Sequence, residues 1–508
     1  MWSTALKCAL LAGVLMPLRG GGGQAELAEA AKEIIDLARV LPAEFATDAI
    51  LALVESGRVR DERLKVDLLE EAFEMAGGAR FPRKLAYHFG DADTREGLLG
   101  DAYELKLDAE SLRCRAIRAM IRLRPRVARQ LFEQIAAFQV PPHSCTSALT
   151  YDPREVFDTL AAVVSEGFDA SERDEGLPLD FAERYVGAIS SPVQVPPAAR
   201  LIVKLGFAGD DFDRLVTTYV AALRRMAPDD RAFCDGRDLI DALDSLVEVC
   251  YKSKVPVAPL AEAARHYILG NLQGVRCADS VRRAARLAQQ AEGQEAVVAQ
   301  YNRSKARKAP YVFREVPAIR PEEARAAKLG PGPENPEYWT TQKGATLGAS
   351  LQRLRFGPPH PDRGRPTVLP LEVRKSPEWL GEMSAVLASV EAWKPETGED
   401  EVDFFLQKAV AYQPLIELAP DGPARDTALG RFVHFLARSP AQHTQPVLWY
   451  VRAAQLLNRL RRSGASAAGA EERPQRDVEW ALREFERSGS LILTLRAKVH
   501  AILPKQNP

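Results

Sequence analysis

Seven arginines lie between residues 113 and 129, and three of them are spaced to share one face of a predicted helix: Arg115, Arg118 and Arg122. Such a ridge can bind phosphate, sulfate or a polyanion through bidentate contacts. The alternative is a solvated helix face paired with nearby acids, and the balanced net charge of −1 favours it. The acids considered are Asp101, Glu104, Asp108, Glu110 and Glu133.

Cysteine chemistry is the second possibility. The cysteines beyond residue 25 are Cys114, Cys145, Cys234, Cys250 and Cys277. They form neither a CxxC pair nor a Cys/His cluster at zinc spacing, so we expect no metal site. In an oxidising compartment we favour the disulfides Cys114–Cys145 and Cys234–Cys277, each stabilising by ~3–4 kcal/mol in the chain-entropy model. Cys250 would remain as a small buried apolar residue. Spacing does not fix pairing, so five free thiols stay the alternative.

Other catalytic patterns are weak. Residues 464–469, GASAAG, approach the GxSxG nucleophile elbow but carry Ala468 at the second glycine. No histidine belongs to HExxH, and neither GxxxxGK nor GxGxxG occurs. We therefore expect no cofactor. Tyr338, Trp339 and Trp379 could form an aromatic platform for sugar or peptide, but packing in a core is the favoured role for such large side chains.

Residues 1–25 resemble an export signal. Lys7 precedes an apolar run from Cys8 to Leu18, and small residues follow, with Gly23 and Ala25 where a signal peptidase would read them. The run of 11 residues is shorter than the ~20 needed to span a bilayer. The alternative is a buried or frayed N-terminal helix. We predict cleavage after Ala25 and a periplasmic or extracellular protein.

Composition predicts an all-α protein. Ala, Leu, Arg and Glu dominate, and these residues lose little side-chain entropy in a helix. The 508 residues suggest two to four domains, and the net charge excludes a global field that would recruit nucleic acid or anionic lipid. No later stretch is apolar for long enough to span a membrane.

The helical period locates the elements. After Asp61, Leu64, Leu68, Leu69, Ala72, Phe73 and Ala76 form one apolar stripe that ends at Gly77-Gly78. The preceding helix begins near Pro42 and ends at Gly57. Short Pro-, Gly- and Asp-rich breaks separate the helices before residue 306, which predicts stacked helical hairpins, as an irregular α-solenoid or α/α superhelix. A compact multi-helix bundle is the alternative. These helices are expected at 109–123, 126–138, 153–166, 178–189, 197–206, 210–226, 230–252, 257–271 and 278–304.

The chain changes character between residues 309 and 377, where 12 of its 35 prolines fall. We expect an extended Pro-rich belt packed on the helices, with one short helix near 343–355. Beyond it we expect helices at 377–393, 400–418, 423–438 and 445–462, a flexible loop at 463–475 and one long final helix. The predicted divisions are 1–25 (signal), 26–306 (N-terminal helical domain), 307–377 (Pro-rich segment) and 378–508 (C-terminal helical domain).

Several stretches resemble exported all-helical proteins of acidobacteria that have no known function. These stretches are LPAEFATDAILALVESG, LKLDAESLRCRAIRAM, RLRFG and DGPARDTALGRFVHFLA. The resemblance covers most of the mature chain, implies export and a helical fold, and brings no activity and no site residues.

The sequence therefore predicts an exported, non-enzymatic scaffold for an extracytoplasmic protein or peptide, held on a surface of stacked hairpins. Two alternatives remain. One is a glycan-active enzyme on an α/α toroid, which would need a deep cleft lined by Trp, Tyr, Arg and paired acids. The other is a polyanion binder, which would need an unpaired arginine ridge.

Overall fold

The computed structural model describes residues 23–81, 85–86, 102–135, 140, 150–227, 233, 236–273, 299, 303, 342–358, 367–462 and 472–502. It confirms the all-α prediction, and the described strands form one two-residue antiparallel bridge, in which β1 (Leu85–Ala86) pairs with β2 (Thr150–Tyr151). The chain divides into two compact units. Unit 1 contains residues 1–59, 89–107 and 335–508, and unit 2 contains residues 60–88 and 108–334.

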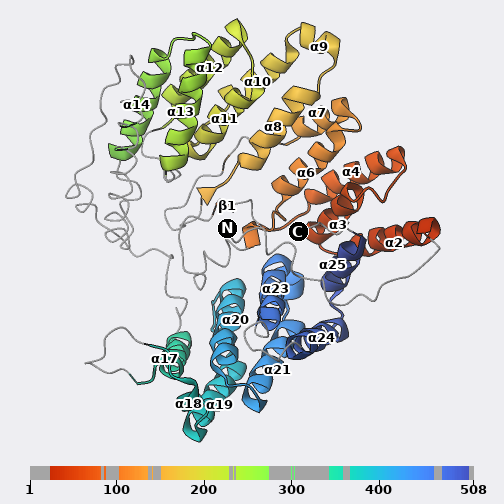
Figure 1. Ribbon diagram of the computed structural model, residues 1–508, viewed down its shortest axis with the longest axis vertical. Helices are drawn as coiled ribbons and strands as arrows, with labels where there is room; N and C mark the ends of the chain where they lie inside the picture. Colours follow the sequence, from red (N-terminus) through yellow and green to blue (C-terminus); the bar gives the residue numbers. More distant parts are fainter. Residues whose placement is uncertain are drawn as a thin grey trace. The chain divides into compact units, whose positions relative to one another are not determined.

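Unit 2 is a stack of helical hairpins (Figure 1). Its helices are α4 (Glu62–Ala76), α6 (Ala109–Ile121), α7 (Pro125–Glu133), α8 (Arg154–Glu166), α9 (Ala170–Asp174), α10 (Leu177–Gly187), η1 (Pro192–Gln194), α11 (Val195–Leu205), α12 (Gly209–Arg225), α13 (Gly236–Lys252) and α14 (Ala258–Gln273).

The contacts within unit 2 define two layers. Helices α4, α6, α8, α11 and α13 pack in succession as the first layer. In the second layer α10 packs on α12 and α12 on α14, while Phe132 of α7 contacts Phe181 and Tyr185 of α10 with ring centroids 6.2 and 5.3 Å apart. The hairpins α6–α7, α8–α10 and α11–α12 join the layers. Each hairpin therefore buries its apolar faces against the next, as in an α-solenoid.

Local signals fix the helix ends where we predicted them. Asp61 caps α4 by accepting a hydrogen bond from the Leu64 amide at 2.7 Å. The helix before it, α3 (Ala43–Glu55), follows Pro42, and Gly57 has φ +71°, a conformation that costs glycine nothing. One detail differs. Leu64, predicted to belong to the apolar stripe of α4, is 43% exposed because the whole first turn of that helix faces solvent.

Unit 1 combines both ends of the sequence. Its helices are α2 (Gly23–Ala38), α3, α17 (Gln342–Phe356), α18 (Leu371–Arg374), α19 (Pro377–Ala392), α20 (Glu401–Leu418), α21 (Pro423–Arg438), α22 (Ala441–Thr444), α23 (Pro446–Arg462), α24 (Glu472–Arg487) and α25 (Leu491–Ile502). The first two pack on each other and both pack on α25. The division therefore differs from the predicted domain 26–306, because the apolar faces of α2 and α3 are buried against the C-terminal helices.

The core of unit 1 is aromatic. Tyr412 of α20 stacks on Phe432 and Phe435 of α21 at 5.3 and 5.6 Å between ring centroids. Trp449 of α23, 0% exposed, meets Phe485 of α24 edge to face at 5.8 Å. Side chains of this size each bury 150–250 Å² and carry much of the packing energy, so they hold the helices of this unit together.

The prediction of one continuous helix at the end of the chain is wrong. It is two helices, α24 and α25, separated by Ser488, Gly489 and Ser490, with Gly489 at φ +77°. A residue in the left-handed region cannot continue an α-helix, so the chain turns there. Residues 472–475, predicted as the end of a flexible loop, belong to α24, and residues 463–471 of that predicted loop lie outside the described residues.

Part of the Pro-rich belt lies within the described residues. The helix expected near 343–355 is confirmed as α17, and α18 adds a short turn after Pro370. Residues 307–341 and 359–366 of the belt lie outside the described residues. So do the predicted helix 278–304, apart from positions 299 and 303, and the predicted signal up to residue 22. Cleavage after Ala25 would remove the first three residues of α2.

Candidate functional site

The predicted arginine ridge lies on α6 and at its C-terminal end. Arg118 forms an ion pair with Glu155 of α8 at 2.9 Å and donates a hydrogen bond to Thr159 Oγ1 at 2.8 Å. Arg115 also has an interaction partner, and Arg122 is an exposed residue at the helix C-cap. The polyanion alternative needs an unpaired ridge, and the pairing of Arg118 argues against it.

Neighbouring arginines of the same cluster also bind helices together. Arg124 pairs with Glu62 of α4, and the Arg113 guanidinium lies 5.0 Å from the centre of the Phe73 ring. These two partners are an acid and a ring on the adjacent helix α4. The cluster contributes to the packing of the stack.

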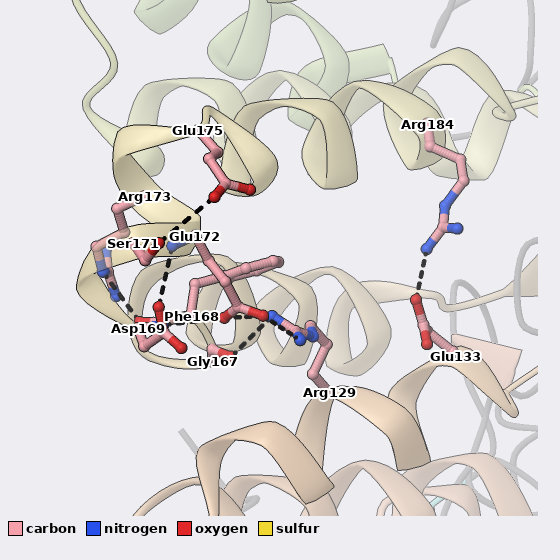
Figure 2. Close-up of polar contacts among 10 residues, drawn as sticks. All are labelled: Arg129, Glu133, Gly167, Phe168, Asp169, Ser171, Glu172, Arg173, Glu175 and Arg184. Atoms are coloured by element: carbon pink, nitrogen blue, oxygen red, sulfur yellow. Dashed lines mark hydrogen bonds and ion pairs between the residues drawn. The ribbon is translucent and has the colours of Figure 1, made fainter.

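Arg129, of the same cluster, binds both a carboxylate and an aromatic ring (Figure 2). It donates two hydrogen bonds to the Glu172 carboxylate, at 2.9 and 2.7 Å, and its guanidinium lies 4.3 Å from the centre of the Phe168 ring. Glu172 also accepts from the Asp169 amide at 3.0 Å, while Asp169 accepts from the Glu172 amide, which forms a capping box for α9. These bonds favour the ionised carboxylate, and they lower the pKa of Glu172 from 4.5 to about 2.

Ion pairs also connect helices of one layer along the stack. In the first layer ion pairs join α6 to α8, through Arg118, and α11 to both α8 and α13. In the second layer ion pairs join α7 to α10 and α10 to α12. The further pairs are Lys204–Asp158, Arg200–Asp238, Arg184–Glu133 and Arg214–Glu183. Each of them links neighbouring hairpins but stabilises the stack little, because exposed pairs contribute little energy.

Only two of the five cysteines considered, Cys114 and Cys250, lie within the described residues. Cys250 is buried, as predicted. Cys114, on α6, is also buried, and desolvation raises the pKa of its thiol to about 12. Cys145, Cys234 and Cys277 lie outside the described residues, so the two proposed disulfides stay predictions.

The predicted aromatic platform is not assembled at Trp379. That residue is 5% exposed, and its indole Nε1 donates to the Leu354 carbonyl at 3.0 Å, so it serves the core of unit 1. Tyr338 and Trp339 lie outside the described residues.

Unit 1 contains a pocket of about 640 Å³ that the sequence did not indicate. Its wall comes from α18, the end of α20, α21 and α23. The lining residues are Leu371, Lys375, Gln413, Ile416, Glu417, Ala419, Pro420, Asp421, Arg425, Phe432, Arg452, Gln455, Leu456 and Leu460. The volume is within the usual range for a small-molecule site, so this pocket is the candidate binding site of unit 1.

Local geometry positions the wall of this pocket. Arg374 donates to the Leu369 carbonyl at 3.1 Å and to the Leu418 carbonyl at 2.6 Å, which holds α18 at the end of α20. Gly422, at φ 129° and ψ −160°, turns the chain into α21 in a conformation that side chains disfavour. This turn places Asp421 before the helix and Arg425 in its first turn.

Two buried arginines distinguish the pocket. Arg425 is 8% and Arg452 3% exposed. Arg425 pairs with Asp477 at 3.2 Å, and Arg452 donates to Gln455 Oε1 at 2.8 Å. A sequence signal exists for Arg425. Arg425 precedes Ala428, Leu429 and Phe432 by three, four and seven positions and so lies on the apolar stripe of its helix.

Within the described ranges, no group of His, Cys, Asp or Glu side chains is arranged to hold a metal ion. The helices described here also include none with the length and apolar character needed to cross a membrane. No protein-family model matches the chain, and no curated protein matches it. The geometry of the chain itself must therefore carry any functional interpretation.

Proposed function

We propose that the protein is exported and acts as a non-enzymatic scaffold, on which the hairpin stack of unit 2 holds an extracytoplasmic protein or peptide. The observation that carries this proposal is the two-layer stack with ion pairs between hairpins of the same layer. Stacked hairpins of this kind present an extended surface whose side chains keep fixed spacings, which suits recognition of a polypeptide.

An exposed aromatic side chain supplies a specific contact point on this surface. Tyr251, in the last turn of α13, is 62% exposed. Tyrosine is enriched among the residues that dominate binding energy at protein interfaces, because it offers a large contact area with few rotatable bonds. We therefore place Tyr251 at the proposed contact surface.

A glycan-active enzyme would present tryptophans to its sugar, but three of the four tryptophans within the described residues are buried in the core, and Trp480 is half-buried. Trp379, Trp393 and Trp449 are 5%, 2% and 0% exposed. The aromatic residue in the lining of the unit 1 pocket is Phe432, itself 3% exposed. These observations favour the scaffold over the glycan enzyme.

Site-specific photo-crosslinking in the producing cell tests the proposal. A photoreactive phenylalanine analogue replaces Tyr251 in one variant and Val40, which is 69% exposed in unit 1, in the matched control. We expect a light-dependent adduct with one defined extracytoplasmic protein at position 251 and none at position 40. The purified partner should bind the wild-type protein and lose about tenfold in affinity with Tyr251→Ala. The same adducts at both positions, or none at position 251, would contradict the proposal.

A further inference from the structure

The charged side chains that line the pocket of unit 1 differ in exposure according to their sign, except for one lysine. Arg425 and Arg452 are buried, whereas Lys375, Glu417 and Asp421 are exposed. A guanidinium stays protonated at any pH that a protein experiences. The buried charged side chains of the lining are therefore both cationic, with Arg425 paired to Asp477, and both acids of the lining are exposed.

The remaining buried lining is mostly apolar. Phe432, Leu456 and Leu460 are 3%, 3% and 1% exposed, and Ala419 and Pro420 are buried beside them. An apolar body placed against these side chains would gain the free energy of leaving water. The pocket thus combines an apolar wall with a cationic interior.

We propose that this pocket binds a small amphiphile with an apolar body and a single carboxylate, and that the carboxylate lies toward Arg452 and Arg425. Guanidinium groups bind carboxylates through short, charge-assisted hydrogen bonds, which are stronger where water is excluded. A single negative charge suits the site better than several, because Asp477 already pairs with Arg425 and because Glu417 and Asp421 repel further negative charge at the exposed part of the lining. This binding site belongs to unit 1 and does not depend on the partner proposed for unit 2.

Calorimetric titration of the full-length protein with octanoate and with octan-1-ol separates the contribution of the carboxylate from that of the chain. We expect saturable binding of octanoate and binding of the alcohol that is weaker by about tenfold or more, the usual effect of one charge-assisted hydrogen bond. Equal affinity for acid and alcohol, or no saturable binding of octanoate up to about 1 mM, would overturn the proposal.

A pair of matched variants locates the binding site. Leu371 lines the pocket at 44% exposure, and Leu491 of α25 has 45% exposure but is not part of the lining. Because both side chains are exposed, we expect tryptophan at either position to leave the fold intact. We expect Leu371→Trp to fill the pocket and weaken octanoate binding by about tenfold, and Leu491→Trp to change it by less than about twofold. An unchanged affinity in Leu371→Trp, or an equal loss in both variants, would place the binding elsewhere and overturn the assignment.

Discussion

Arg496 of α25 forms an ion pair with Asp48 of α3, a residue 448 positions earlier in the chain. The two side chains are 26% and 13% exposed. Arg496 Nε also lies 3.3 Å from the Tyr450 hydroxyl, and Tyr450 meets Phe45 of α3 edge to face at 5.4 Å. The early and late helices of the sequence are thus joined within unit 1 by one mixed polar and aromatic contact.

Removal of one partner should destabilise unit 1. We expect Asp48→Ala to lower the free energy of unfolding by about 1–3 kcal/mol, because it leaves a largely buried guanidinium without its carboxylate. Urea unfolding followed by tryptophan fluorescence measures this effect, since all six tryptophans of the sequence fall within unit 1. The exposed pair Lys498–Glu33, which joins α25 to α2, is the control, and Lys498→Met should cost less than about 1 kcal/mol. An equal effect of both substitutions would contradict the importance of burial at Asp48.

The Arg129–Glu172 pair predicts a pH-dependent stability of unit 2. The folded-state pKa of Glu172, about 2, lies below its ordinary value of 4.5. The pair therefore contributes fully above about pH 4.5, and its contribution is lost as the pH falls from there toward 2. We expect Glu172→Gln to be less stable than wild type near neutral pH and the difference to vanish near pH 2, as measured by circular dichroism during urea unfolding. Glu175→Gln, at a neighbouring exposed carboxylate, is the control. A stability difference that does not vary with pH would contradict this role of Glu172.

Two glycines of unit 1 should respond to alanine in opposite directions. Gly489 has φ +77°, so Gly489→Ala should destabilise by about 1–2 kcal/mol. Gly430 lies inside α21, where an added Cβ would meet Trp480 at an ordinary distance of 3.8 Å, so Gly430→Ala should stabilise by about 0.5–1 kcal/mol. Fluorescence-monitored unfolding measures both. A gain in stability with Gly489→Ala would mean that α24 and α25 do not need this turn.

Thiol titration tests the proposed disulfides. If Cys114–Cys145 and Cys234–Cys277 both form, one thiol, that of Cys250, should react in the denatured and unreduced mature protein. In the folded protein that thiol should react slowly, because Cys250 is fully buried and burial raises its pKa to about 12. Five reactive thiols after denaturation would exclude both bridges.

Local signals predicted most helix ends but not long-range contacts. The helix expected at 423–438 has those bounds, since Pro423 begins it and Ser439 follows it. By contrast, nothing near Asp48 or Arg496 in the sequence indicates that they meet, because their contact depends on how α3 and α25 fold together. The break at Gly489 was missed because apolar residues continue at helical spacing on both sides of it.

The candidate pocket was harder to predict than the fold. Its wall combines segments spread between residues 371 and 460, and no one of them contains a recognisable motif. Arg425 and the exposed Arg431 are two arginines of the same helix, α21. Only their positions relative to the apolar stripe of that helix distinguish the buried one from the exposed one. For the arginine ridge the sequence suggested a binding site, because the arginines cluster there. In the structure Arg118 instead holds α6 against α8.

Export of the chain is the step on which the proposed partner class and both disulfides depend. Intact-mass analysis of the protein recovered from cell fractions of its producer measures that step directly. We predict a chain that begins at Glu26 in the extracytoplasmic fraction. A chain that retains residues 1–25 in the cytosol would contradict export and would remove the partner and disulfide proposals together, while the helical fold would be unaffected.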